Sequence, residues 1–469
     1  MAVTSDASAP PDPVVAELLA ALPADRVLLD PDVMATYQHD EAEWAEFGRA
    51  AAVVRPRSTE EVAAVVAACA RHARPLVPRG AGTGLSGGAN AVDGCVVLST
   101  ERMREIVEIN AAERLAVVQP GVVNDDLRAA VAEHGLWYPP DPASSLWSTV
   151  GGNVATNAGG LCCVKYGVTR DYVLALELVT AAGEVVRVGR RTAKGVAGYD
   201  LAGLMVGSEG TLGVITEVTV KLRPLRTSPR RTVVGFFDTL AAAGDAVSRV
   251  TARGVQPAAF ELIDRVCLHA VNAWKHAGLP ETAAALLLAQ TDLPDPAGQQ
   301  EAEAIHAEFV AAGASDAMLS TDEVEADALF EARRLAYPAM EQLGGAILTE
   351  DVCLPRGELA EMLARIEQIA ARHDTPIATV AHAGDGNLHP MLLTRHGDEA
   401  GKARAQAAFE DILDAALELG GTVTGEHGVG LLKLSGMRRE LGPEVVAMQR
   451  AIKAALDPQG ILNPGKVVG

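Results

Sequence analysis

Two histidines and a glutamate in the C-terminal part of the chain could together hold a metal ion. The segment 382–389 reads His-Ala-Gly-Asp-Gly-Asn-Leu-His, so it begins with His382 and ends with His389. Apolar runs at 377–380 and 391–393 flank it. Asp-Gly between two apolar runs predicts a β-hairpin, which would place both histidines near the turn. Glu426 follows in a glycine-rich bend. Two neutral imidazoles and one carboxylate, with one coordination position left open, are typical of a catalytic zinc site.

Each of these side chains also has an ordinary structural interpretation. The rings of His382 and His389 could simply bond to backbone groups, and the pair alone does not decide the matter. His427, directly after Glu426, could be a general base or a plain loop histidine. Because these two residues are adjacent, we expect their side chains to point different ways, one toward a metal and one toward a substrate. Arg333, in an Arg-Arg pair on a predicted helix, could clamp an anion or be a solvated charge.

A glycine-rich segment at 78–89 is the strongest signal in the N-terminal half. It reads Pro-Arg-Gly-Ala-Gly-Thr-Gly-Leu-Ser-Gly-Gly-Ala, and so much glycine suits a backbone that presents bare N–H groups to a phosphate. Residues 82–87 match the dinucleotide fingerprint G-x-G-x-x-G, but that fingerprint must open a helix. Here a turn at 90–94 and a short strand at 95–99 follow. We therefore predict a phosphate-cradling loop between two strands, with an ordinary hairpin loop as the alternative.

Two further stretches rich in small residues follow. One runs through 151–160 after a Pro-rich segment at 139–145, and the other, at 207–213, leads into an alternating strand at 214–222. No repeat period joins the three stretches. They are predicted to form three walls of one site for a large ligand that carries phosphates and a flat ring.

The predicted helices and strands that must position these residues fall into two regions with different patterns. Up to about residue 226, short strands and helices alternate, and a capping box at 58–61 predicts one helix start. Beyond it, a β-α-β-α-β run at 231–289 predicts a separate sheet that helices cover on one face. Further helices are expected around 302 and 329 and at 358–373.

Composition excludes several classes of function. The net charge of −21 argues against nucleic-acid binding, and no apolar run approaches the ~20 residues of a transmembrane segment. The first residues have no basic or apolar region of a signal peptide. The six cysteines form no C-x-x-C pattern, so we expect reduced thiols and no iron–sulfur cluster in this chain. A cytoplasmic protein is predicted.

Together these motifs make the chain resemble the FAD-dependent 2-hydroxy-acid dehydrogenases of the vanillyl-alcohol-oxidase superfamily, from about Tyr37 to the end. That group includes D-lactate dehydrogenase and the glycolate oxidase flavin subunit. The three glycine-containing stretches resemble its FAD-binding segments. The segments 382–389, 425–430 and 456–466 resemble its C-terminal motifs.

The resemblance implies an α+β fold. It consists of a PCMH-type FAD-binding domain, an α/β cap domain built on an antiparallel sheet, and a C-terminal helical segment that returns to the flavin. The expected parts are an N-terminal helical segment at 1–46, the FAD-binding domain at 47–226, a substrate or cap domain at 227–420, and the completing segment at 421–469.

The resemblance also implies the residues that bind the cofactor. Superfamily members with covalently attached flavin often carry a histidine in the phosphate loop, and this loop has none, so the expected FAD is non-covalent. The implied FAD-binding residues are Pro78, Arg79, Gly80, Ala81, Gly82, Thr83, Gly84, Ser86, Gly87, Gly88, Pro142, Ser145, Gly151, Gly152, Asn153, Thr156, Asn157, Gly159, Gly160, Glu209, Gly213, Val214, Ile215 and Asn463.

By the same resemblance, the C-terminal polar residues carry the reaction. His382, His389 and Glu426 would hold a divalent metal, with zinc as the first expectation and iron or manganese as alternatives. His427 would be the general base, and Arg333 with Tyr337 would bind the substrate. The metal would lower the pKa of the substrate hydroxyl, the base would take its proton, and the flavin would accept a hydride.

The substrate expected is a short D-2-hydroxy acid of the D-lactate or glycolate type. The region around Arg333 is similar to the glycolate oxidase pattern, and 346–355 is closer to D-lactate dehydrogenase. Thr349 stands where the D-2-hydroxyglutarate enzymes have a lysine, which favours a monocarboxylate. D-2-hydroxyglutarate oxidation, a flavin subunit active only in a glycolate-oxidase-like complex, and a metal-dependent hydrolase are the alternatives.

The electron acceptor is left open among a quinone, a cytochrome, an electron-transfer flavoprotein and an iron–sulfur subunit. Such a partner could hold the protein peripherally at a membrane. A homodimer is also compatible with the sequence.

Overall fold

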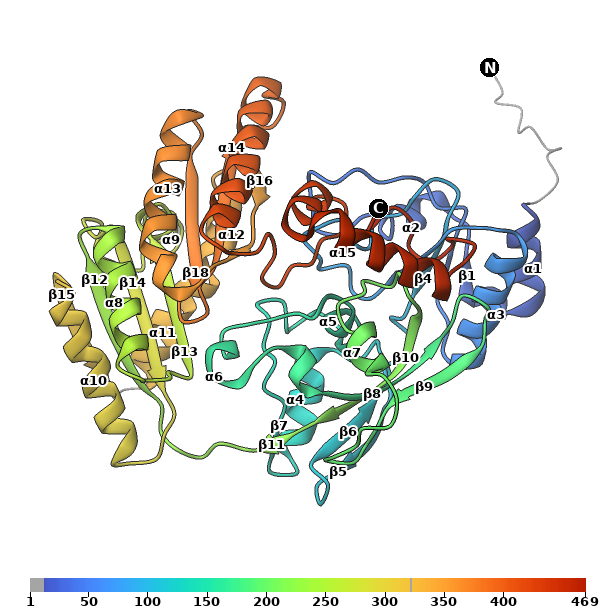
Figure 1. Cartoon of the computed structure of the whole chain (residues 1–469), viewed down its shortest axis with the longest axis horizontal. Helices are drawn as coiled ribbons and strands as arrows, with labels where there is room; N and C mark the ends of the chain where they lie inside the picture. The colour runs from blue at the N-terminus through green and yellow to red at the C-terminus, as the bar shows by residue number, and fades with distance from the viewer. Residues whose placement is uncertain (1–11, 321–322) are drawn as a thin grey trace.

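The computed structural model describes residues 12–320 and 323–469, so the first residues of the predicted N-terminal segment lie outside it. In Figure 1 the parts before and after residue 226 form two bodies side by side, and the C-terminal helix α15 (Leu434–Leu456) returns from the second to the first.

The first body begins with a four-stranded sheet in the order β1 (Val27–Leu28), β2 (Ala52–Val54), β4 (Val96–Ser99), β3 (Leu76–Arg79). Helix α3 (Thr59–Arg71) connects β2 to β3, and the Ser58 hydroxyl caps it by accepting the Glu61 N–H at 3.3 Å, as the sequence predicted. β3 and β4 are parallel neighbours. The glycine segment between them is therefore a crossover at one sheet edge, which rejects the hairpin alternative.

The other two glycine stretches lie next to a second sheet, which is fully antiparallel. Its order is β5 (Ile106–Asn110), β6 (Leu115–Val118), β10 (Val214–Lys221), β8 (Val173–Val179), β9 (Val185–Gly189). Helices α4 (Asn124–Ala132) and α5 (Val150–Thr156) pack their apolar side chains against it. Residues 151 and 152 thus lie inside the short helix α5, which the Thr149 hydroxyl caps by accepting the Gly152 N–H. Within the second glycine stretch, only 157–160 is an open loop.

The second body is built on an eight-stranded antiparallel sheet. Its order is β15 (Asp316–Ser320), β12 (Arg231–Phe237), β14 (Ala285–Thr291), β13 (Ala259–Asp264), β18 (Ile377–His382), β19 (Asn387–Thr394), β16 (Ala346–Thr349), and β17 (Val352–Cys353) also pairs with β19. The predicted hairpin over 377–394 is present as β18 and β19.

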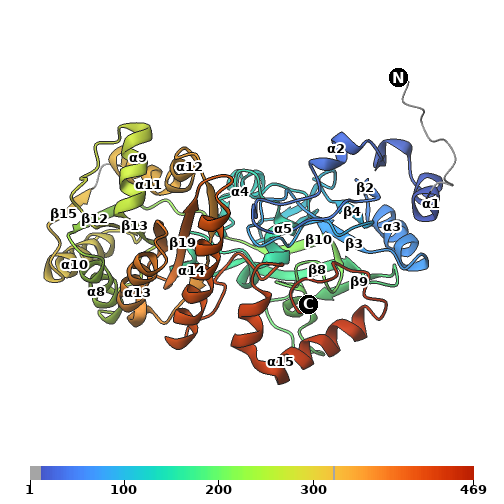
Figure 2. The same ribbon diagram turned by 90° about the horizontal axis from the view of Figure 1, so that it is seen from above.

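The expectation that helices cover only one face of this sheet was wrong. Helices α8 (Leu240–Ala252), α10 (Ala297–Ala311), α13 (Leu359–Arg372) and α14 (Glu399–Glu418) pack on one face. Helices α9 (Arg265–Lys275), α11 (Glu323–Arg334) and α12 (Ala336–Glu341) pack on the other, and Figure 2 shows the sheet between the two layers. The reason is visible in β12, which sends Val233 and Phe237 into one core and Val234 and Phe236 into the other.

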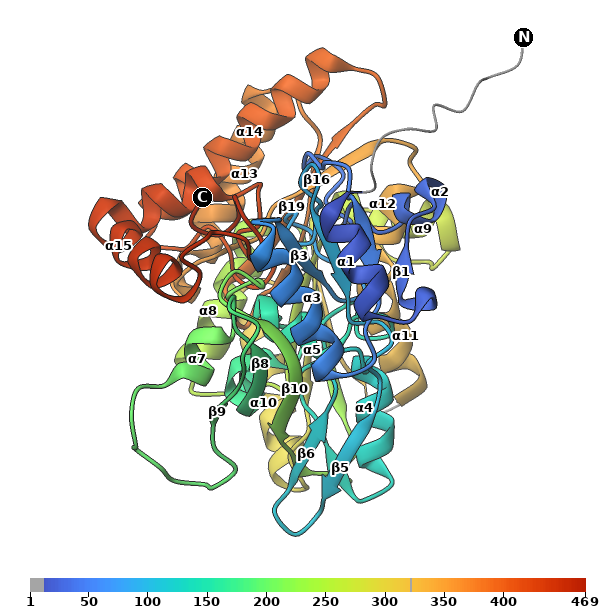
Figure 3. The ribbon, with the colours of Figure 1, turned by 90° about the vertical axis from the view of Figure 1, so that its right-hand side faces the viewer.

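The C-terminal segment fastens the two bodies together. After α15, the backbone at 461–463 runs beside β3: Leu76 N–H donates to Ile461 O, and Asn463 N–H donates to Leu76 O, each at 2.8 Å. Figure 3 shows α15 beside α14, where Met437 and Val446 join the apolar cluster of the second body. Near the other end of α15, Lys453 donates to the backbone oxygen of Thr211 in the first body at 2.7 Å. No helix within the described ranges is long and apolar enough to cross a membrane. The remaining short elements are α1 (Pro13–Ala21), α2 (Pro31–Ala35), β7 (Leu136–Trp137), α6 (Cys163–Tyr166), α7 (Leu201–Met205) and β11 (Arg223–Pro224).

Candidate active site

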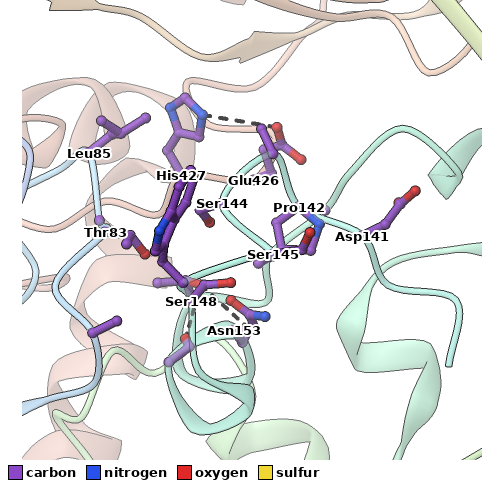
Figure 4. A pocket seen from close by; sticks show the side chains of 18 of the residues that line it. Thr83, Leu85, Asp141, Pro142, Ser144, Ser145, Ser148, Asn153, Glu426 and His427 are labelled. Atoms are coloured by element: carbon purple, nitrogen blue, oxygen red, sulfur yellow. Dashed lines mark hydrogen bonds and ion pairs between the residues drawn. The ribbon is translucent and has the colours of Figure 1, made fainter. Parts of the chain in front are cut away.

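A cavity of about 950 Å³ lies where the two bodies meet, and residues from all three glycine-containing stretches line it. Figure 4 shows residues of the first two stretches facing Glu426 and His427 across the pocket. Most of the residues expected to bind FAD line this cavity: Pro78, Arg79, Gly80, Ala81, Gly82, Thr83, Gly84, Ser86, Gly88, Pro142, Ser145, Gly151, Gly152, Asn153, Thr156, Gly159, Glu209, Gly213, Val214 and Ile215.

Four residues of that set do not line the cavity. Asn157 ends α5 in the left-handed conformation and lines a smaller neighbouring cavity. Asn463 is buried and donates from Nδ2 to the backbone oxygen of Glu209 at 2.7 Å, so it ties loops together. Gly87 and Gly160 have φ of +78° and +155°, which other residues rarely adopt. These four shape the loops that line the cavity.

The glycines fit a site that must let other groups come close. A Cβ on Gly80 would lie 2.6 Å from the Thr149 hydroxyl and 3.5 Å from Gly152 Cα, so the missing side chain lets the first stretch come close to the start of α5. A Cβ on Gly159 would lie 2.2 Å from a Glu426 carboxylate oxygen, so this glycine makes room for the polar cluster. The volume and the bare-backbone walls suit a large cofactor such as FAD.

The three residues expected to hold a metal converge on one point. In the β18–β19 hairpin, His382 pairs with Asn387 and His389 pairs with Val380, so both histidines lie on the same face of the sheet. Glu426 Oε1 lies 3.2 Å from Nε2 of His382 and 3.2 Å from Nε2 of His389. Both histidines are buried.

His427 lies at the same centre. Its Nε2 is 4.0 Å from Glu426 Oε1, an approach drawn in Figure 4. The expectation that Glu426 and His427 point different ways was wrong, because the bend at 425–428 turns both side chains toward the histidine pair. Two sets of potential ligands therefore overlap here, His382–His389–Glu426 and Asp351–His389–His427.

Asp351 is a site residue that sequence reasoning missed. It is fully buried, and its Oδ2 accepts the backbone N–H groups of Gly425, Glu426 and His427 at 2.9, 3.0 and 2.9 Å. One carboxylate thus fixes the bend that carries the glutamate and the candidate base. The available signal was an acidic pair, Glu350 and Asp351, between two strongly apolar segments.

The electrostatics of this cluster suit a cation. Burial alone would lower the pKa of His382, but the carboxylates of Glu261 and Glu426 outweigh it and hold that pKa well above its ordinary value. Burial would likewise raise the pKa of Glu426, and the neighbouring histidines hold it well below its ordinary value. His389 Nδ1 and Asp351 Oδ1 are buried 3.7 Å apart, without a hydrogen bond to any described residue. The donor set matches the two-imidazole, one-carboxylate ligation of zinc.

His427 differs from His382 in its protonation. Burial lowers the pKa of His427 to about 4, because the attraction of Asp351 for the charged form does not offset the loss of hydration. The ring is therefore neutral near pH 7. A neutral imidazole is able to accept a proton.

Arg333 and Tyr337 also line the cavity. The Arg333 side chain is only 11% exposed, and its Nε donates to Glu261 at 2.9 Å. Burial raises the pKa of Tyr337 to about 12, so its hydroxyl stays protonated. Arg334 lines the cavity as well, but it is half exposed and pairs with Glu331 at 3.5 Å.

The first body holds the bend at 425–430 directly. The Ser86 hydroxyl donates to the backbone oxygen of Gly428 at 2.9 Å. The buried carboxylate of Glu209 accepts the N–H groups of Val429 and Gly430 at 2.7 and 3.0 Å. Residues of the first and third glycine stretches therefore set the position of Glu426 and His427.

Comparison with known proteins extends over both bodies. Residues 50–189 match the model of an FAD binding domain, and residues 226–467 match the model of the C-terminal domain of FAD linked oxidases. Glycolate oxidase subunit GlcD of Bacillus subtilis is 44% identical over 416 residues, covering 89% of this chain and 88% of that protein. A D-lactate dehydrogenase of Archaeoglobus fulgidus is 38% identical over 423 residues, covering 89% and 91%.

Solved structures agree on the architecture. The structure of p-cresol methylhydroxylase with substrate bound aligns with a TM-score of 0.79 over 97% of this chain and 96% of that one. At 20% sequence identity this likeness speaks for the fold alone. The predicted α+β fold with a PCMH-type FAD-binding domain is confirmed.

Proposed function

This chain belongs to the family of FAD-linked oxidases, and we propose that it oxidises a short D-2-hydroxy acid of the D-lactate or glycolate type to the 2-oxo acid. Family membership makes it an oxidoreductase and sets aside the hydrolase alternative. The observation that carries the proposal is one cavity whose walls are the three glycine stretches on one side, and the His382–His389–Glu426 cluster with His427 and Arg333 on the other.

The geometry supports a proposed role for each of these residues. FAD, when bound, supplies the hydride acceptor, and a divalent metal on His382, His389 and Glu426 would polarise the substrate hydroxyl. Arg333 binds the substrate carboxylate through its terminal amino groups, with the Tyr337 hydroxyl as a second donor. His427, neutral in the buried site, accepts the hydroxyl proton at Nε2.

The cavity wall next to Arg333 supports a small monocarboxylate. Phe330, Val380 and Met391 line it with apolar surface, and Thr349 supplies a hydroxyl in place of a cation. Thr349 offers no cation to a second carboxylate, as in D-2-hydroxyglutarate, so a cation for it would have to come from Arg226, Arg230 or Arg334, which also line the cavity. The names of the relatives, glycolate oxidase subunit and D-lactate dehydrogenase, support the same substrate range.

A partner chain is part of the proposal. The Bacillus subtilis relative is named as a subunit, which supports a complex in which a second protein takes the electrons. An iron–sulfur subunit, a cytochrome or an electron-transfer flavoprotein could be that protein, and a free quinone is the alternative acceptor. Addition of an artificial acceptor would replace the partner in an assay.

We propose that the FAD is held without a covalent bond. The first glycine stretch contains no histidine to which flavin could attach. Acid precipitation should therefore release a yellow supernatant that chromatographs as FAD. Flavin that stays with the pellet, or FMN in the supernatant, would contradict this part of the proposal.

The substrate is tested by steady-state turnover with a redox dye as acceptor. D-lactate, L-lactate, glycolate and D-2-hydroxyglutarate would be compared by kcat/KM. We expect D-lactate or glycolate to lead and L-lactate to trail. A clear preference for D-2-hydroxyglutarate would overturn the monocarboxylate assignment, and no turnover of any hydroxy acid would overturn the proposed reaction.

A further inference from the structure

Glu261 is a fully buried carboxylate at the centre of the cap sheet, and the reaction as described gives it no task. It lies on β13, and its register partners are Leu288 on β14 and His382 on β18. Its neighbours along the strand, Phe260 and Leu262, are buried in the apolar core. A charged side chain at such a position is costly unless its partners compensate for the lost hydration.

Two polar partners compensate Glu261, and both belong to the candidate site. Oε1 lies 2.8 Å from His382 Nδ1, and Oε2 accepts from Arg333 Nε at 2.9 Å. One carboxylate therefore bridges the residue expected to bind the substrate carboxylate and a residue expected to bind the metal. Both partners are themselves largely buried, at 11% and 7% side-chain exposure.

Each contact leaves the working atoms of its partner free. When Nδ1 of His382 donates to Glu261, the proton is fixed there and the Nε2 lone pair is presented to the site. The contact with Arg333 engages Nε, so the two terminal amino groups of the guanidinium remain available for a forked pair of hydrogen bonds.

The chemistry of a 2-hydroxy acid explains why such a bridge is useful. Its hydroxyl and carboxylate sit on adjacent carbons, so the groups that recognise them must be held at a fixed and short separation. A positional error of about 1 Å in such a site is enough to cost much of the rate. Arg333 lies on α11 and His382 lies on β18, and Glu261 is the side chain that bonds to both.

We propose that Glu261 is a positioning residue that couples substrate-carboxylate recognition at Arg333 to metal binding at His382. This inference rests on the proposed function, since it uses the roles given there to Arg333 and His382. It adds that the two roles are not independent: loss of the bridge weakens both.

The test measures both roles without turnover. The carbonyl oxygen of Glu261→Gln can accept from one partner, but its amide group can only donate. Toward Arg333 Nε the amide faces another donor, and toward His382 Nδ1 it holds the ring proton on Nε2, the atom expected to bind the metal. In metal-stripped protein that retains FAD, the affinity for Zn²⁺ would be measured by calorimetry. The affinity for propionate, a carboxylate without the hydroxyl, would be measured through the perturbed flavin spectrum.

We expect Glu261→Gln to weaken Zn²⁺ binding about 10–100-fold, as loss of a carboxylate behind a metal-binding histidine does, and to weaken propionate binding as well. Glu177→Gln is the matched control, because Glu177 is also a buried, arginine-paired glutamate, on β8 and away from the cluster. It should leave both affinities unchanged. A purely structural role of Glu261 would lower thermal stability and move neither affinity.

Retention of both affinities within about twofold of wild type, or loss of only one of them, would overturn the coupling. If Glu261→Gln fails to retain FAD, Glu261→Asp replaces it, since the shorter side chain cannot reach both partners. Wild-type protein that binds neither Zn²⁺ nor propionate would also overturn the assignment. Wild-type protein that binds both but oxidises no hydroxy acid would contradict the proposed function and leave the coupling standing.

Discussion

The imidazole rings of His389 and His427 lie face to face, with centroids 4.8 Å apart and planes inclined by 13°. One ring comes from the β18–β19 hairpin and the other from the bend at 425–428, so two segments distant in sequence meet in one stack. Asp351 lies against both, through the N–H of His427 at 2.9 Å and toward Nδ1 of His389 at 3.7 Å. The candidate base and a candidate metal ligand are therefore held as one rigid unit.

Because His427 stacks on His389, it could be either the general base or a metal ligand, and a variant of His427 distinguishes the two roles. If His427 is the general base, His427→Ala should slow the reduction of flavin by substrate about 10²–10⁴-fold. Metal and FAD content should stay near wild type, because His382, His389 and Glu426 remain. Rapid-mixing kinetics without oxygen would measure the rate, and elemental analysis would measure the metal.

Glu426→Gln is the matched variant for this test, since it changes the neighbouring residue and the expected ligand. It should lose metal and activity together. The rival arrangement, with Asp351, His389 and His427 as ligands, predicts that His427→Ala loses the metal and that Glu426→Gln is mild. A His427→Ala protein that reduces its flavin at the wild-type rate would exclude the base assignment.

Arg333→Lys should raise the KM for the hydroxy acid. An ammonium cannot reproduce the fork of a guanidinium, and the lost charge-assisted bond is worth ~1.5–3 kcal/mol, or roughly 10–100-fold in binding. Arg334→Lys is the comparison on the next residue, which also lines the cavity but is half exposed and pairs with Glu331, so a smaller effect is expected. An unchanged KM in Arg333→Lys, or the larger effect in Arg334→Lys, would show that the substrate carboxylate binds elsewhere.

Removal of the metal should separate chemistry from cofactor binding. The ligand candidates are distinct from the residues of the three glycine stretches, so chelation should abolish flavin reduction by substrate and leave the flavin absorbance in place. Zn²⁺ added back should restore the rate, with Mn²⁺ and Fe²⁺ as the comparison. Full activity in protein verified to be metal-free would remove the metal from the mechanism.

Stability should depend on pH through Glu209. Burial raises the pKa of this carboxyl from 4.5 to about 7, and the N–H donors of Val429 and Gly430 offset only part of the increase. Because the folded-state pKa is the higher one, its contribution is fully present below about pH 4.5 and is lost as pH rises through 7. The difference amounts to ~3 kcal/mol.

Glu209→Gln mimics the protonated acid and should remove this dependence. The variant should therefore gain stability over wild type at pH 8 and not at pH 4.5, as measured by the midpoint of chemical unfolding. Glu184→Gln, at an exposed position, is the control and should follow wild type at both pH values. Parallel pH profiles for Glu209→Gln and wild type would show that Glu209 is ionised at little cost.

Much of the architecture could be predicted because its signals are local. The helix after Ser58 and the hairpin around Asp385-Gly386 are encoded in a few consecutive residues, and both are present. The second layer of helices on the cap sheet was missed. A fully buried strand such as β14 has no alternation to show how many faces are covered.

The same distinction between local and distant signals applies to the residues of the site. His382, His389 and Glu426 were expected to come together, and the structure brings them together. Asp351 and Glu261 were missed because their partners lie 73–76 and 72–121 positions away along the chain, where no spacing rule applies. An acidic residue inside an apolar stretch of sequence is the signal to look for in such cases.

The proposed reaction is the transfer of a hydride from a short D-2-hydroxy acid to the flavin. Its most direct test is a single-turnover titration of the purified protein without oxygen, followed by the visible spectrum. We expect that D-lactate or glycolate bleaches the flavin in stoichiometric amount and yields one equivalent of the 2-oxo acid. A flavin that a chemical reductant bleaches, but that none of D-lactate, L-lactate, glycolate and D-2-hydroxyglutarate reduces, would contradict it.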